Sequence, residues 1–73
     1  MAFHLIQGEK GVYFLQDTDA DARTRATFYN PKGRWWEGTD IGGRRRRIYV
    51  PLRIGDKNAQ ATHVAWAMTR PRH

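Results

Sequence analysis

The 73-residue sequence contains no cysteine and no serine. Without cysteine, neither a disulfide framework nor a thiolate zinc site can supplement a small hydrophobic core. The same absences remove two of the commonest catalytic nucleophiles. A domain of this size buries only about 60% of the surface that its unfolded chain exposes. Its stability must therefore come from packing, and three Trp, three Tyr, three Phe and the aliphatic residues are available for it.

Long apolar runs are also missing, because the longest apolar stretches are far below the roughly 20 residues that a membrane-spanning helix needs. The first ten residues, MAFHLIQGEK, lack the basic start and the long apolar centre of a signal peptide. We therefore expect a cytoplasmic protein without membrane contact. Its length predicts one domain over residues 1–68, followed by a flexible tail at 69–73.

Recognisable catalytic motifs are absent as well. The stretch GTDIGG has neither the spacing nor the lysine of a phosphate-binding loop. A chain this short is poorly suited to enclosing a cleft of roughly 300 Å³ or more, the usual size of a ligand site. We expect a binding protein that needs no cofactor, and not an enzyme.

Metal sites are not indicated by the acidic or histidine residues. Asp17, Asp19 and Asp21 have the first spacings of a calcium loop, but Ala22 and Phe28 stand where that loop needs glycine and glutamate. The three histidines show no ligand spacing, and each is better explained as a surface or packed residue; they are His4, His63 and His73.

Positive charge is concentrated in the second half of the chain. Residues 1–40 hold five basic and six acidic groups, whereas residues 41–73 hold eight basic groups and one acidic group, which gives sums of −1 and +7. Ten of the thirteen cations are arginine, whose planar fork binds carboxylate or phosphate through two hydrogen bonds. A G·C-rich genome would also enrich arginine. An acidic partner is expected to meet the C-terminal half.

Two hairpins are predicted in the first half. Residues 2–6 and 11–16 are β-prone and are separated by QGEKG, which favours a tight connection. The stretch TFYNPKGRWWEG at 27–38 predicts a second hairpin with a type I turn at NPKG. Between them, residues 17–26 have capping-box spacing and predict one or two helical turns.

The second half is more ambiguous. Regular alternation predicts a strand over 48–54, with Ile48 and Leu52 on the same side, although Pro51 restricts it to a sheet edge or breaks it. In residues 57–68, four alanines and a possible Asp56 cap favour a helix. The alternation of larger residues in the same segment favours a strand, and our interpretation leans to the strand.

These elements predict a mainly β fold. The expected architecture is a small antiparallel meander, or an SH3-like partly open barrel, of about five short strands, with or without one short helix.

The stretch GGRRRRIYVPLRIG at 42–55 is the main candidate for a binding surface. If residues 44–54 form one strand, Arg44 and Arg46 lie on the core-facing side but beyond the edge of the core, where they reach water. The open face then carries a basic stripe with an aromatic residue inside it, made by Arg45, Arg47, Tyr49 and Arg53. Such a stripe suits acidic protein side chains, or phosphates with a stacked base. The alternative is a charged strand end that prevents edge-to-edge pairing.

Adjacent Trp35 and Trp36 must face opposite ways in a strand, so one is expected in the core and the other partly exposed. The exposed ring is predicted to pack against Phe28 or Tyr29 on a neighbouring strand, or to anchor an interface. The complete set of predicted contact residues is Arg44, Arg45, Arg46, Arg47, Tyr49, Arg53, Trp35 and Trp36.

The whole chain, from MAFHLIQGEKGVYFLQ through GRWWEG and GGRRRRIYVPL, resembles the small transcription regulator of a Xanthomonas-infecting lytic phage. The resemblance implies a protein that binds host RNA polymerase, interferes with σ-factor engagement at initiation and acts as an antiterminator. It gives no support for individual contact residues. We expect a monomer. The residues themselves are compatible with such a partner, because exposed arginine and aromatic side chains suit acidic or apolar patches on a large enzyme.

Two other functions remain open from the residues alone. The charge of the second half also fits a sequence-tolerant nucleic-acid binder, so the arginines at 44–47 have either protein or phosphate partners. RWWEG followed by RIYVPL is partly similar to SH3-type barrels, which implies a peptide-binding adaptor, but here Tyr49 precedes Pro51 rather than following it.

Overall fold

The computed structural model describes residues 3–18 and 23–70. Within them the chain forms five strands, one 3₁₀ turn and one α-helix. In chain order the elements are β1 (Phe3–Gln7), η1 (Glu9–Gly11), β2 (Val12–Asp17), β3 (Thr24–Lys32), β4 (Trp35–Thr39), β5 (Arg45–Tyr49) and α1 (Lys57–Met68).

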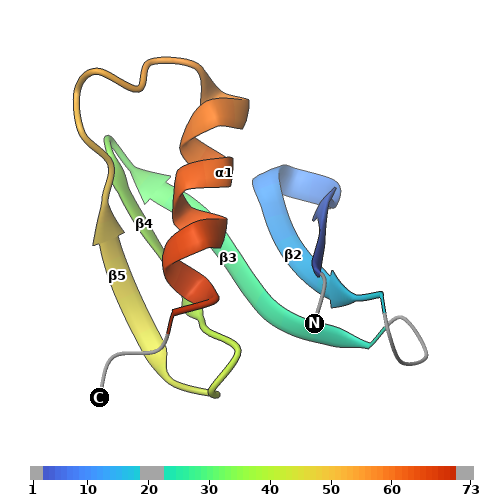
Figure 1. Ribbon diagram of the computed structural model, residues 1–73. Helices are drawn as coiled ribbons and strands as arrows, with labels where there is room; N and C mark the ends of the chain where they lie inside the picture. The colour runs from blue at the N-terminus through green and yellow to red at the C-terminus, as the bar shows by residue number, and fades with distance from the viewer. Residues whose placement is uncertain (1–2, 19–22, 71–73) are drawn as a thin grey trace.

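The strands form one antiparallel sheet in the order β1-β2-β3-β4-β5, so each strand pairs with its neighbour in the chain. The sheet is curved but does not close into a barrel. Helix α1 packs on one face of it, and in the view of Figure 1 it lies in front of β3 and part of β4, between β5 on its left and the β1–β2 hairpin on its right. The predicted antiparallel meander of five short strands with one helix is confirmed.

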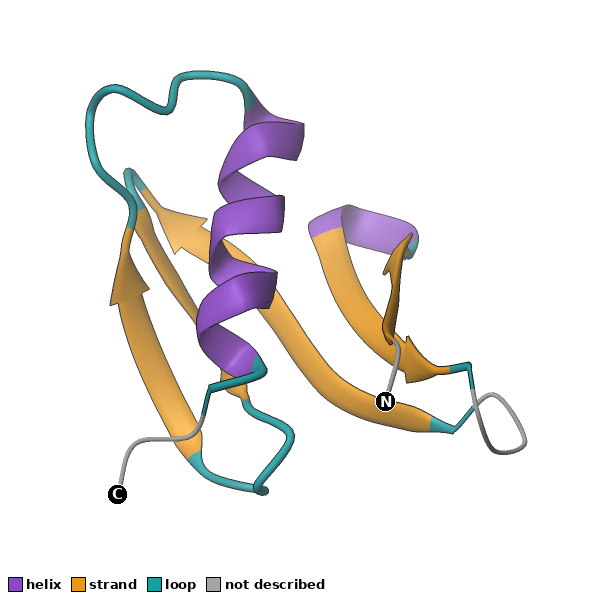
Figure 2. Ribbon diagram, in the orientation of Figure 1, coloured by secondary structure: helices purple, strands orange, loops and turns teal. Residues whose placement is uncertain are grey.

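The core lies between α1 and the sheet face that α1 covers (Figure 2). At its centre, the rings of Tyr13, Phe28 and Trp36 lie 5.6 to 6.0 Å apart, measured between centroids. The buried Trp36 indole donates to Gln60 Oε1 at 3.2 Å, which ties the sheet to the helix and satisfies both polar groups. Smaller side chains complete the core, namely Leu15, Ala26, Ile48, Val50, Ala61, Val64, Ala65 and Met68.

Both predicted hairpins are present. The first joins β1 to β2 through η1, where Lys10 and Gly11 have positive φ angles of 57° and 77°. The second joins β3 to β4, but the predicted NPKG turn is wrong, because Pro31 is still in β3 and the turn residues are Gly33 and Arg34. A two-residue hairpin turn favours a positive φ at its first position, and Gly33 supplies it at 58°.

The alternation predicted over 48–54 does not continue beyond Tyr49, where β5 ends, so the structure has the alternative in which the strand is broken near Pro51. Pro51 cannot donate to a ladder, and Arg34 binds the carbonyl oxygens of the following loop instead. Arg34 Nε donates to Val50 O at 2.8 Å, and its terminal nitrogen donates to the carbonyls of Pro51 and Ile54. The chain therefore leaves the sheet, and Leu52 is 78% exposed rather than directed into the core.

The preference for a strand over 57–68 is also wrong, since this segment is α1. The Asp56 carboxylate caps it by accepting from Ala59 N at 3.0 Å, as the helical alternative predicted. The face of α1 that packs on the sheet has helical spacing and is made by Gln60, Ala61, Val64, Ala65 and Met68. Trp66, which strand alternation grouped with Val64, points away from the core and is 59% exposed.

Residues 17–26 form no helical turns where the structure describes them. Asp17 ends β2 and forms a 3.3 Å ion pair with Arg25, while β3 begins at Thr24. Asp19 and Asp21, on which the capping and calcium spacings depend, lie outside the described residues. Among residues 3–18 and 23–70, no group of three His, Cys, Asp or Glu side chains is arranged to hold a metal ion.

The predicted tail at 69–73 is described only as far as Arg70. Thr69 N donates to Ala65 O and Arg70 N to Ala67 O, both at 3.1 Å, so these two residues continue the end of α1. Residues 71–73 lie outside the described part of the chain. In the part of the chain that the structure describes, no helix is long and apolar enough to cross a membrane.

Candidate binding surface on the open face of the sheet

The two adjacent tryptophans occupy opposite faces of β4. Trp36 is fully buried under α1, whereas Trp35 is 43% exposed on the face that the helix leaves uncovered. This division between core and surface was predicted. The predicted partners Phe28 and Tyr29 were wrong, because Trp35 pairs with Tyr49 across β4 and β5. Their rings meet edge to face, with centroids 5.2 Å apart and planes at 67°.

Arg47 completes this pair of rings. Its guanidinium carbon lies 5.1 Å from the centroid of the Trp35 ring, within cation–π range. Its Nε lies 3.8 Å from the Glu37 carboxylate, which is the cross-strand neighbour of Arg47. The Arg47 side chain is still 68% exposed, so the ring and the carboxylate orient the guanidinium while leaving most of it accessible.

Arg45 extends the same face by one cross-strand position, because it pairs with Thr39. Beside it is a shallow hollow of about 380 Å³, lined by Glu37, Arg45, Arg46 and Arg47. Arg45 and Arg47 are exposed on this face beside the Glu37 carboxylate, so the net charge at the hollow is positive, as a site for an anionic group requires. We refer to the five residues Trp35, Glu37, Arg45, Arg47 and Tyr49 as the open-face cluster.

Arg46 lies on the helix side of β5, as alternation predicted, but it does not reach into open water as expected. Its guanidinium donates to Ala67 O at 2.6 Å and to Arg70 O at 3.2 Å. The same nitrogen lies 4.0 Å from the fully buried Asp40 carboxylate. The carbonyl end of a helix favours a cation nearby, and Ala67 O, which already accepts from Arg70 N, takes a second hydrogen bond from Arg46.

Arg44 and Arg53 are exposed but lie outside the strand. The Arg44 main chain closes the turn after β4, where its N–H donates to Asp40 Oδ1 at 3.0 Å. Arg53 belongs to the loop after β5, so the period-two rule that grouped it with Arg47 does not apply to it. The structure therefore brings together Arg45, Arg47, Tyr49 and Trp35 from the predicted set, while Arg46 and Trp36 have structural contacts.

The sequence analysis did not predict the roles of two residues, Arg34 and Leu52. Arg34 holds the 50–54 loop, and Leu52 is the most exposed large apolar side chain among the described residues. The signal for Arg34 was its place directly after the turn glycine; in the fold this turn lies beside the end of β5, where Val50 N donates to Arg34 O at 2.9 Å. No signal in the sequence distinguished Leu52 from the inward-facing residues of the expected strand.

Comparisons of the chain with protein-family models, with curated proteins and with solved structures gave no match. The fold is a small antiparallel sheet that α1 covers on one face. The other face carries the paired aromatic rings and the arginines of the open-face cluster.

Proposed function

We propose that the protein binds host bacterial RNA polymerase through the open-face cluster, interferes with σ-factor engagement at initiation and acts as an antiterminator. The resemblance stated for the whole chain supplies the partner. The observation that carries the proposal is the contact of Arg47 and Tyr49 with the exposed ring of Trp35. Aromatic and arginine side chains that are held in place by their neighbours dominate protein–protein affinity.

The electrostatics suit an acidic patch on one of the large polymerase subunits. Arg45 and Arg47 are exposed on one face, and the chain as a whole carries a formal charge of +6. Complementary charge accelerates encounter and sets the register of the complex, while the two rings bury apolar area. No cofactor takes part in this mechanism.

The first test is co-elution of nuclease-treated protein with purified bacterial RNA polymerase holoenzyme and core enzyme on a sizing column at low and moderate salt. We expect retention at moderate salt, and a smaller bound fraction with holoenzyme than with core because σ competes for engagement. Transcription assays on a σ-dependent promoter and a terminator template then report inhibition and readthrough. Elution without polymerase at both salt concentrations would contradict the proposal.

The contact assignment is tested with the double variant Arg45→Glu, Arg47→Glu. Both side chains are exposed, so the fold should persist, as circular dichroism will check, while co-elution is lost. Lys10→Glu is the control, because it reverses a charge in η1, away from the open-face cluster. Wild-type retention by the folded double variant would refute the assignment.

A nucleic-acid partner is the second candidate, supported by the hollow that Arg45, Arg46 and Arg47 line. It predicts binding of single-stranded RNA with a log–log salt slope of about −0.7 per phosphate neutralised. A peptide-binding adaptor is the third, supported by the proximity of Trp35 and Tyr49. Shifts of the Trp35 indole NMR signal on adding a proline-rich peptide would favour it, and unchanged signals would exclude it.

A further inference from the structure

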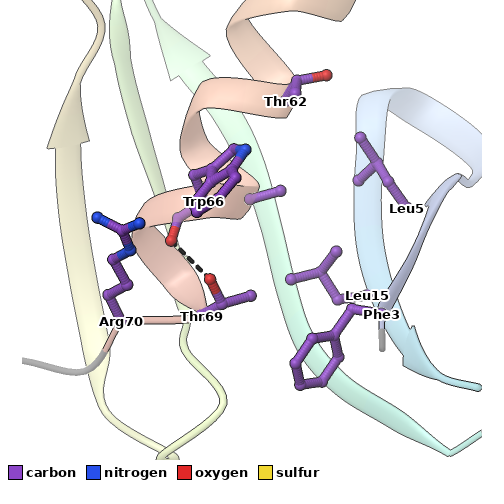
Figure 3. A pocket seen from close by; sticks show the side chains of 8 residues that line it. Phe3, Leu5, Leu15, Thr62, Trp66, Thr69 and Arg70 are labelled. Atoms are coloured by element: carbon purple, nitrogen blue, oxygen red, sulfur yellow. Dashed lines mark hydrogen bonds between the residues drawn. The ribbon is translucent and has the colours of Figure 1, made fainter. Parts of the chain in front are cut away.

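A second surface lies on the other side of the sheet, in a groove between α1 and the β1–β2 hairpin. The groove has a volume of about 550 Å³. Figure 3 shows the strand residues on one side of it and the helix residues on the other. Its lining consists of Phe3, Leu5, Leu15, Thr62, Ala65, Trp66, Thr69 and Arg70.

The walls of the groove are mostly apolar. Phe3 and Leu5 are half-buried against the core, and across from them the Trp66 side chain is 59% exposed. The groove exists because α1 covers the sheet beside β1 and β2 without filling the bend that they form. Its volume lies within the range of roughly 300–1,000 Å³ that is typical of ligand sites, although we expected no cleft of that size in so short a chain, and it can accept one or two apolar side chains.

The only charge in the lining is positive. The Arg70 guanidinium stacks on the Trp66 ring, with its carbon 4.7 Å from the ring centroid. None of the eight lining residues is acidic. An occupant that presents an apolar group to Leu5 and Trp66 therefore gains from an anionic group placed near Arg70.

The groove borders a free strand edge. β1 is the first strand of the sheet order and pairs only with β2 among the described strands. Gly8 N donates to Val12 O at 2.7 Å, and these two residues continue the β1–β2 register. Hydrogen-bonded and non-hydrogen-bonded pairs alternate in an antiparallel ladder, so His4 and Ile6 of β1, like Gly8, are the residues bonded to β2. The backbone N–H and C=O groups of Phe3, Leu5 and Gln7 consequently point away from β2. Their side chains at 3 and 5 line the groove, so backbone and side-chain recognition coincide there.

We propose that this groove binds an extended segment of a partner protein, which adds a strand to the edge of β1. The segment inserts an apolar side chain between Leu5 and Trp66 and places a carboxylate, two residues along, beside Arg70. The backbone of the segment forms hydrogen bonds with the free edge of β1. The apolar walls of the groove select its apolar side chain, and Arg70 selects its carboxylate. The proposal goes beyond the proposed function, because this site is on the face opposite to the open-face cluster and needs neither polymerase nor σ factor.

The test uses an array of acetylated, amidated heptapeptides of the form Thr-Thr-X-Thr-Z-Thr-Thr, in which X and Z lie on the same side of an extended chain. We expect selection of Leu, Ile, Phe or Met at X and of Asp or Glu at Z. The best peptide is then titrated into ¹⁵N-labelled protein. The Leu5 and Gln7 amides and the Trp66 indole should shift, while the Trp35 indole should not.

Three variants distinguish this mode of binding from non-specific binding to an exposed apolar surface. Arg70→Glu should weaken binding by at least about fivefold, the size expected for reversing one rim charge. Trp66→Ala should weaken it further. The charge-matched control Lys10→Glu should bind like the wild type. A peptide whose edge-facing amides are N-methylated should not bind, because it cannot pair with β1.

The proposal is overturned by a flat array, by selection of Lys or Arg at Z, or by shifts confined to the open face. Binding of single-stranded RNA at the Trp66 indole in place of peptide would also overturn it, as would a dimer in sedimentation that the peptide does not dissociate. Because the readouts do not involve polymerase, failure here leaves the proposed function standing, and the reverse also holds.

Discussion

The Arg46 guanidinium donates to the Ala67 carbonyl at 2.6 Å and so joins the middle of β5 to the end of α1. The bond spans 21 positions of the chain and sits beside the buried Asp40 carboxylate. A second link, from Ile41 N to Met68 O at 3.1 Å, runs between the same two regions. One end of the helix is thereby fixed to the turn that connects β4 to β5.

Replacing Arg46 with Met is expected to lower the free energy of unfolding by about 2–3 kcal/mol, because the buried Asp40 carboxylate loses its nearby cation and the carbonyls of Ala67 and Arg70 lose a charged donor. In a domain of this size each 1 kcal/mol corresponds to a fall in Tm of roughly 4–8 °C. Arg45→Met, next to it on the exposed face, should stay within about 0.5 kcal/mol of the wild type. Chemical denaturation of both variants measures this difference, and equal losses would contradict the assignment of Arg46 to the interior.

Arg34→Lys is expected to loosen the loop after β5. Lysine keeps the charge but not the planar fork that donates to the carbonyls of Val50, Pro51 and Ile54. We expect a loss of about 1–2 kcal/mol, since the lost bonds come from a charged donor. Hydrogen exchange should accelerate at the Ile54 amide. Arg53→Lys in the same loop is the control, and matching exchange rates in the two variants would disprove the role of Arg34.

Gly38→Ala is expected to be among the most damaging single substitutions. An added Cβ would lie 2.1 Å from Thr27 O and 2.6 Å from Phe28 Cα, so the β3–β4 pair would have to separate. We expect a loss of about 3 kcal/mol or more, at the upper end for overpacking. Gly55→Ala is the matched control, because no atom lies within 4 Å of its added Cβ. It should be neutral or stabilise by up to about 1 kcal/mol. Thermal unfolding compares the two.

Asp56→Ala should cost about 1 kcal/mol through loss of the side-chain cap on Ala59 N. Asp56→Asn keeps an accepting oxygen in the same place, so most of the stability should be retained. Urea titrations followed at 222 nm distinguish these cases. If alanine and asparagine destabilise equally, the charge of Asp56 rather than its hydrogen bond holds the helix start.

The candidate surface was predictable to the extent that neighbouring residues in a strand alternate. Trp35 and Trp36 face opposite ways, and Arg45, Arg47 and Tyr49 share the open face, because side chains in a strand have a period of two. The same rule failed for Arg53 and Leu52, because it assumes that the strand continues. The strand ends at Tyr49, two residues before Pro51, and the Arg34 fork from the β3–β4 turn holds the carbonyls of the loop that follows.

By itself, the sequence determined the local features of this protein: both hairpins, the Asp56 cap and the opposite directions of the two tryptophans. These depend on short-range geometry, on glycine at positive φ and on the pleat of a strand. Tertiary structure decided whether residues 57–68 form a helix or a strand, since that choice depends on a sheet face which accepts alanines and Met68 at helical spacing. It also decided that Arg46 belongs to the interior, because only the folded chain brings the carbonyls of α1 within its reach.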